Sequence, residues 1–144
     1  MPWTAEEPLS SEQRLALIEG WDAEWRAGGS FNFGLRKGEE VVGGCGLLDR
    51  IGDGGLEIGY WVRSGYTGRG YATEAARALT TAAFTIPEIE RVEIHHDRAN
   101  VASSRIPEKL HFARVGETAD EVAAPGEVGV EVVWRMNRQD WPVA

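Results

Sequence analysis

Residues 60–75 read YWVRSGYTGRGYATEA, an apolar run followed by a glycine-punctuated turn and the start of a helix. The first N–H groups of a helix have no partners within it, and the helix dipole adds positive potential at that end. Gly68 and Gly70 lack a Cβ, so an anion can approach the main chain closely, and Arg69 adds a cation between them. The stretch is therefore a candidate phosphate-binding turn, and an ordinary tight turn is the alternative.

Beyond the turn, apolar residues recur at helical spacing and predict a helix from 71 to about 86 that Pro87 stops. Its expected buried face comprises Tyr71, Ala75, Ala78, Leu79, Ala82 and Ile86. The small alanines would let this helix lie close to a sheet.

The chain of 144 residues, 42% hydrophobic and 26% charged, has the size and composition of a single domain spanning 1–144. A net charge of −8 argues against nucleic acid as the partner; it suits an amine-bearing substrate, although solubility alone explains the same charge. The lone Cys45 excludes an internal disulfide and a cysteine metal cluster, which fits a reducing cytoplasm. No apolar run is long enough for a membrane span, and residues 1–9 are not a signal peptide.

Periodicity predicts the remaining elements. We expect helices at 11–27, with Ser10 as N-cap, and at 101–110, with Asn100 as N-cap. We expect strands at 31–35, 41–48, 56–62, 91–97, 112–117 and 128–136.

Two residues stand out on the predicted strands. Glu57 shares a strand face with Gly59 and Trp61, so it is a candidate general base. Cys45 lies among glycines in an apolar strand; core packing explains it better than nucleophilic catalysis, because no histidine–carboxylate pair is placed near it in the sequence.

Residues Thr67–Ala72 resemble the acyl-CoA-binding motif of the GNAT superfamily of N-acyltransferases, Arg/Gln-x-x-Gly-x-Gly/Ala. Thr67 departs from the usual first residue of that motif. The run GRGYATEA is especially similar to the branch named after the ribosomal-protein acetyltransferases RimJ and RimL.

A second resemblance covers Asn100–Phe112, where GNAT proteins carry an asparagine, a small residue three positions later and a Leu-Gly-Phe-like end to the helix. His111 replaces the usual glycine, and Pro107 should kink the helix or shorten its first half. A tyrosine that serves many members as general acid near this proline is absent.

The resemblance implies an α+β, three-layer fold: a mixed, mostly antiparallel sheet flanked by helices, with a splayed strand pair at the acyl-CoA site. It implies transfer of an acetyl group from acetyl-CoA, without a metal, to a primary amine on a protein N-terminus or a small molecule. The expected cofactor-binding residues are Trp61, Val62, Thr67, Gly68, Arg69, Gly70, Tyr71, Ala72, Asn100 and Ser103. The expected catalytic residues are Glu57 as base, with His96 or Asp97 as alternates, and Ser103 as the proton donor to the thiolate. Ser103 could equally bond its own helix backbone.

Several alternatives stay open at this point. By this resemblance, we expect the chain to start after the first strand and helix of the family, which would leave an unpaired sheet edge and favour a homodimer. An acyl-CoA-binding or interaction module without catalysis is the rival function, and a longer acyl donor would fit the glycines at 43–46. The acceptor is not specified, because loops form that pocket.

Overall fold

The computed structural model describes residues 30–119, 122 and 125–142. The helix predicted at 11–27 lies outside this range. In chain order, the elements are β1 (Ser30–Lys37), β2 (Glu40–Leu48), β3 (Gly55–Val62), η1 (Ser64–Tyr66), α2 (Tyr71–Ala83), β4 (Arg91–Asp97), α3 (Val101–Lys109), β5 (Ala113–Ala119), β6 (Val130–Asn137) and η2 (Arg138–Asp140).

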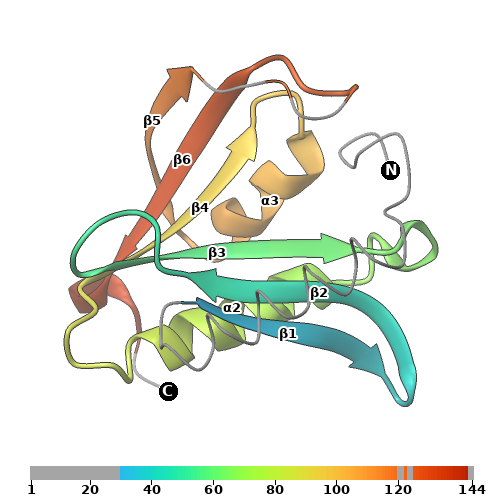
Figure 1. The fold of residues 1–144 in the computed structure, drawn as a ribbon, viewed down its shortest axis with the longest axis horizontal. Coiled ribbons are helices and arrows are strands. Elements are labelled where there is room, and N and C mark those ends of the chain that lie inside the picture. Colours follow the sequence, from blue (N-terminus) through green and yellow to red (C-terminus); the bar gives the residue numbers. More distant parts are fainter. Residues whose placement is uncertain (1–29, 120–121, 123–124, 143–144) are drawn as a thin grey trace, which may run out of the picture.

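The six strands form one sheet in the order β1-β2-β3-β4-β6-β5 (Figure 1). Every neighbouring pair is antiparallel except β3 and β4, which run parallel because α2 connects them as a crossover. The sheet is thus mixed and mostly antiparallel, as predicted.

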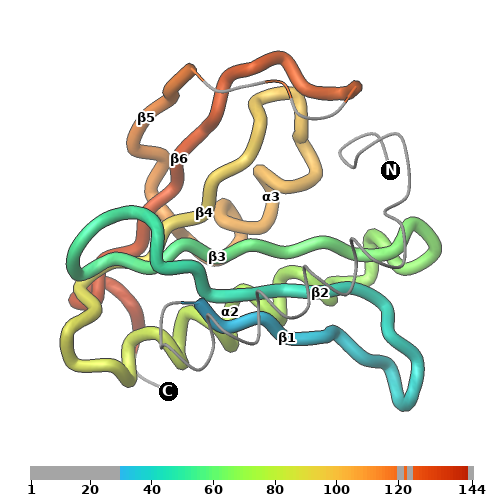
Figure 2. Tube along the Cα trace, viewed as in Figure 1, coloured from blue at the N-terminus to red at the C-terminus, as the bar shows by residue number. Residues whose placement is uncertain are grey.

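The parallel pair β3 and β4 separates along its length. The ladder joins Gly55–Ile58 to Arg91–Ile94, yet β3 continues to Val62 and β4 to Asp97. Figure 2 shows the two traces diverging toward the end of the sheet where β3 leads into α2. This divergence is the splayed strand pair that the sequence resemblance implies.

The two helices pack against the sheet, α2 on β2 and β3, and α3 on β4 and α2. The buried face of α2 consists of Ala75, Ala76, Leu79, Thr80 and Ala83. The predicted face was wrong at Ala78 and Ala82, which are exposed, because the helix is rotated toward the Ala76 and Ala83 side.

The helix α2 also ends earlier than predicted. Residue Ala83 is its last, and the amides of Thr85 and Ile86 bond three residues back in a tighter turn. A proline disfavours the α conformation at the residue before it, so the helix ends before Pro87.

The hydrophobic core lies between the sheet and these helices. Its buried members are Leu47, Leu56, Ile58, Ala76, Leu79, Ala83, Ile89, Val92, Ile94, Leu110, Phe112 and Met136. The last two strands are shifted by one to two residues from the predicted 112–117 and 128–136, because Phe112 is buried in this core before β5 begins. Within the described residues, no helix is long and apolar enough to cross a bilayer.

Candidate active site

The turn between β3 and α2 has the backbone conformation that its glycines predict. Gly68 and Gly70 have φ values of 75° and 83°, a region that disfavours residues with a Cβ. A Cβ placed on either glycine would meet no atom within 4 Å, so the space beside both is open. Glu74 makes the first helical hydrogen bond, to Gly70, which leaves the amides of Tyr71, Ala72 and Thr73 directed out of the helix end. The turn therefore offers an open row of N–H groups to an anion.

Cationic side chains flank this turn. The Arg69 guanidinium lies 5.2 Å from the centre of the Tyr66 ring and that of Arg63 lies 5.7 Å from it. Both arginines are exposed, so they can move toward a bound phosphate. Thr67, the departure from the family motif, uses its hydroxyl to close the turn on the Ser64 carbonyl.

The end of β3 presents main-chain groups to the gap between the splayed strands. The Arg63 amide donates to the Val42 carbonyl, so Arg63 is hydrogen-bonded to β2. Alternate residues of a strand direct their main-chain groups to the same side. Trp61 therefore also faces β2, whereas Tyr60 and Val62 face the gap. Sequence reasoning named Trp61 and missed Tyr60; strand alternation was the signal that could have found it.

A hydrogen bond joins this strand to α3. The Tyr60 hydroxyl donates to the Ser103 carbonyl at 3.1 Å. In a regular helix that carbonyl would accept from the amide four residues later, which is Pro107, and proline has no N–H. The helix runs through Pro107 to Lys109, so the predicted shortening was wrong. Tyr60 supplies the donor that Pro107 lacks, and burial raises the pKa of its phenol.

The start of α3 is capped as predicted. The Asn100 side chain accepts from the Ser103 amide at 3.2 Å. Ser104 bonds its own helix backbone, through the Val101 carbonyl, whereas the Ser103 side chain interacts with the Tyr60 phenol and partly offsets the effect of burial on its pKa. His111, which follows α3, adopts a φ of 64°, the conformation that explains why glycine is usual there.

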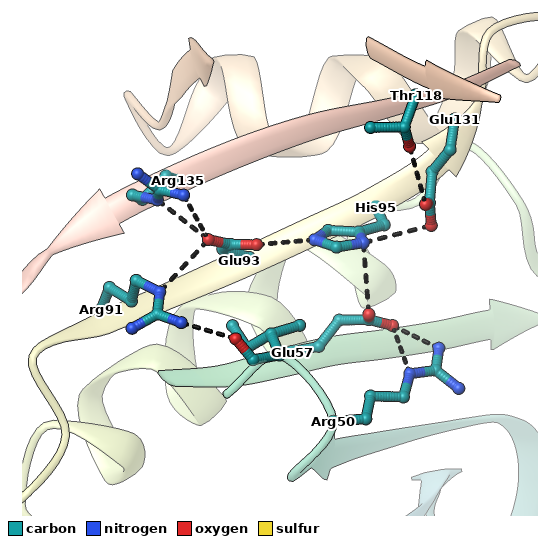
Figure 3. A network of polar contacts seen from close by, with 9 residues as sticks. Arg50, Glu57, Arg91, Glu93, His95, Thr118, Glu131 and Arg135 are labelled. Carbon is teal, nitrogen blue, oxygen red and sulfur yellow. Dashed lines mark hydrogen bonds and ion pairs between the residues drawn. The ribbon is translucent and has the colours of Figure 1, made fainter. Parts of the chain in front are cut away.

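Glu57 belongs to a polar network on the sheet face opposite α2 and α3 (Figure 3). It is only 5% exposed. Its carboxylate pairs with Arg50 and lies 3.3 Å from Nδ1 of His95. Glu93, paired with Glu57 across the parallel ladder, is the next carboxylate in this network.

The two alternates to Glu57 lie elsewhere. His96 is buried on the opposite face of β4, where its Nε2 accepts from the Trp134 indole and its Nδ1 bonds the Asp97 carbonyl. Burial, the largest influence, lowers the pKa of His96, so the ring is held neutral. Asp97 accepts from the amides of Ala99, Val128 and Gly129. Burial alone would raise the pKa of Asp97, but these hydrogen bonds lower it. The same bonds hold the loop that precedes β6.

A cavity of about 450 Å³ lies over β1, β2 and β3. Glycines 34, 43, 44, 46 and 59 form much of its lining, with Trp61 and Asn32 among the larger side chains. Nδ2 of Asn32 is buried without a hydrogen-bond partner. Cys45 also lines the cavity and packs against the core, and burial raises the pKa of its thiol. The thiolate that a nucleophile needs is therefore disfavoured.

Comparison with known proteins agrees with this geometry. Residues 1–113 match the family model described as acetyltransferase (GNAT) domain. The chain is 29% identical over 140 residues to "Putative ribosomal N-acetyltransferase YdaF" of Bacillus subtilis (strain 168), covering 95% of this chain and 76% of that protein.

Solved structures share the fold. One described as "Probable acetyltransferase" superposes with a TM-score of 0.87 at 28% identity, covering 97% of this chain and 80% of that one. Mycobacterium smegmatis RimJ in complex with CoA-disulfide superposes with a TM-score of 0.82 at 23% identity, covering 98% of this chain and 71% of that one. The family match spans most of the chain, and the glycine turn and splayed strands are its expected features. The chain therefore belongs to the acetyltransferase (GNAT) domain family of acyl-CoA-dependent N-acetyltransferases.

Proposed function

We propose that this protein transfers the acetyl group of acetyl-CoA to a primary amine by direct attack in a ternary complex. The observation that carries the proposal is the open turn at Gly68–Ala72, which stands directly beside the splayed ends of β3 and β4. An anion-binding turn and unpaired strand edges in one place suit a ligand that has a pyrophosphate at one end and amides along its arm. Mycobacterium smegmatis RimJ, which shares the fold, has a structure in complex with CoA-disulfide.

The residues toward the donor divide into three groups. The amides of Gly68 to Ala72 would hold the pyrophosphate, with Arg69 as a mobile countercharge. Main-chain groups of Val62 would bond the acetyl and pantetheine amides, and we add Tyr60, which faces the same gap. The N–H groups on this strand would also stabilise the oxyanion that forms during attack. Asn100 would hold the start of α3, and so Ser103, beside the gap.

An amine is protonated at neutral pH and cannot attack until a base removes a proton. Glu57 is our candidate for this role because, although Arg50 pairs with it, it also lies 3.3 Å from the ionisable ring of His95. The other two candidates, His96 and Asp97, have only structural bonds to indole or main-chain groups. Glu57 is buried and lies away from Val62 along β3, so we expect a water molecule to carry the proton from the amine to its carboxylate. On the donor side, the Ser103 hydroxyl, which lies beside the Tyr60 phenol, would protonate the departing thiolate.

The acceptor we propose is a polypeptide N-terminus, and small-molecule amines are the second class. The related B. subtilis protein is named a putative ribosomal N-acetyltransferase, and the N-terminus of a ribosomal protein carries such an amine. Acetyl-CoA and ribosomal proteins both occur in the cytoplasm, so we expect the protein to act there.

The test is release of CoA with peptide and small-molecule amine panels, followed by mass detection of the acetylated product. Glu57→Gln should lower kcat by about 10²-fold or more, which is the usual contribution of a general base. Ser103→Ala should lower kcat with unchanged acetyl-CoA affinity, and Ser104→Ala is its matched control, because Ser104 bonds only its own helix.

The rival function, an acyl-CoA-binding module without catalysis, makes a different prediction. It requires saturable acetyl-CoA binding with no turnover of any amine and no effect of Glu57→Gln. Comparing acetyl with longer acyl donors in the same assay tests whether the cavity lined by glycines 34, 43, 44, 46 and 59 extends the donor range.

A further inference from the structure

His95 is surrounded by three carboxylates from three neighbouring strands (Figure 3). Its Nε2 lies 2.8 Å from Glu93, and its Nδ1 lies 3.1 Å from Glu131 and 3.3 Å from Glu57. All these side chains stand on the sheet face opposite α2 and α3. One imidazole nitrogen thus faces two carboxylates, of which one is the proposed base.

Glu93 fixes the orientation of the His95 ring. Arg135 donates to it from Nε at 2.9 Å, with its Nη2 at 2.8 Å, and the Nε of Arg91 lies 3.4 Å away. Burial alone would raise the pKa of Glu93, but the hydrogen bonds from His95 and Arg135 outweigh it and lower that pKa. Glu93 therefore stays an acceptor, and Nε2 of His95 donates a hydrogen to it. An ionised carboxylate only accepts hydrogen bonds, so Nδ1 donates its hydrogen to Glu131, and Glu57 is the second acceptor near that atom.

The three carboxylates around His95 differ in whether an arginine neutralises them. Arg50 neutralises Glu57, and Arg91 and Arg135 neutralise Glu93. Among the described residues, the partners of Glu131 are only His95 and the Thr118 hydroxyl at 3.5 Å. Its side chain is also 28% exposed, against 6% for Glu57. A proton on Nδ1 is thus attracted toward the carboxylate that lacks a guanidinium and lies nearest to solvent.

His95 also has a suitable position along its strand. It is the first residue of β4 beyond Ile94, where pairing with β3 ends. On β3, the last residue that pairs with β4 is Ile58, and Glu57 comes directly before it. The side chain of His95 therefore stands between the proposed base and the open end of the splayed pair.

We propose that His95 is a proton relay that regenerates Glu57 in each turnover, with Glu93 as the residue that orients it. This inference rests on the proposed function. The ammonium of the acceptor gives its proton to the Glu57 carboxylate through water and becomes a neutral amine. Nδ1 of His95 gives its hydrogen to Glu131, which releases it to solvent, and Nδ1 takes the proton of the Glu57 acid in its place. The balance is one proton moved from ammonium to solvent, with every relay group restored.

The kinetic test compares His95→Gln with wild type on two acceptors. One is a peptide with an ordinary N-terminal amine; the other carries an aminooxy group, which is uncharged at neutral pH and needs no base before attack. We expect His95→Gln to lower kcat for the amine about 10²-fold, to change the aminooxy rate less than about threefold, and to leave KM for acetyl-CoA unchanged. Added imidazole buffer should restore the amine rate in proportion to its concentration.

The control variant is His111→Asn, which replaces an exposed histidine beyond α3 with a residue that tolerates the same φ. It should match wild type on both acceptors. Equal losses on both acceptors, or a loss that buffer does not relieve, would show that His95 has only a structural role. An unchanged amine rate would also overturn the relay.

A second measurement does not depend on turnover. Nitrogen NMR of the imidazole rings should show a hydrogen on Nε2 of His95 and another on Nδ1, and Glu93→Gln should change the Nε2 signal. A His95 ring without a hydrogen on Nδ1 would overturn the relay, because that atom would have no proton to give to Glu131. If wild type acetylates no acceptor, the proposed function fails by itself, and this measurement still decides the orientation of His95.

Discussion

The bond between Tyr60 and the carbonyl of Ser103 offers a prediction that depends on a single missing N–H group. Tyr60→Phe removes only the hydroxyl and leaves that carbonyl without its donor, since Pro107 cannot supply one. Losing a partly buried hydrogen bond of this kind costs about 1 kcal/mol. For a chain of 144 residues we expect Tm to fall by about 3 °C.

The second variant, Pro107→Ala, restores the amide that the helix lacks. The new N–H group at this position could donate to the Ser103 carbonyl, so Tyr60→Phe should cost much less in this background. Pro107 is fully buried, and its replacement has its own effect on packing and on the unfolded chain. The coupling energy of the double-mutant cycle removes those effects, and we expect about 0.5–1 kcal/mol.

Urea denaturation of the four proteins at one pH measures this cycle, provided that their m-values agree. Tyr71→Phe is the control for losing a tyrosine hydroxyl: within the described residues its only contact of note is with the Tyr66 ring, and its stability should match wild type. Additive effects within about 0.3 kcal/mol would refute the idea that the tyrosine replaces the proline's missing donor.

Three further predictions concern the turn, the buried histidine and the sheet edge. Gly70→Ala places a Cβ at a φ of 83° and should weaken acetyl-CoA binding at least about tenfold by calorimetry, whereas Gly65→Ala, whose φ is ordinary, should not. Burial holds the pKa of His96 below its usual 6.5, so the unfolded chain binds a proton that the folded protein does not; stability should fall as pH drops below 6.5, and His96→Asn should flatten that dependence in urea titrations. The homodimer expected from the sequence stays a prediction: size-exclusion chromatography with light scattering should give twice the chain mass, and a monomer at high concentration would contradict it.

The sequence was most informative where local chemistry decides the structure. Gly68 and Gly70 predicted a turn with positive φ, and Asn100 predicted a cap; both are present. Alternation along 56–62 predicted that Glu57 lies on the face opposite Leu56 and Ile58; those two residues join the core, whereas Glu57 joins the polar network of Figure 3.

What the sequence could not predict depends on contacts between distant residues. The expected shortening at Pro107 was wrong, and Tyr60, which is 43 positions from Ser103, supplies the donor that the proline lacks. The separate environments of His95 and His96 likewise depend on β6, which brings Glu131 to one face and Trp134 to the other. No local pattern carries that information, since the pairing of β4 with β6 sets it.

The measurement that tests the account most directly is a crystal structure of this protein with acetyl-CoA bound. We predict pyrophosphate oxygens within hydrogen-bond distance of the amides of Gly68 to Ala72, and the thioester between β3 and β4 beside Val62. Acetyl-CoA bound elsewhere, for example with its phosphates away from the start of α2, would contradict the assignment of this turn and the mechanism built on it.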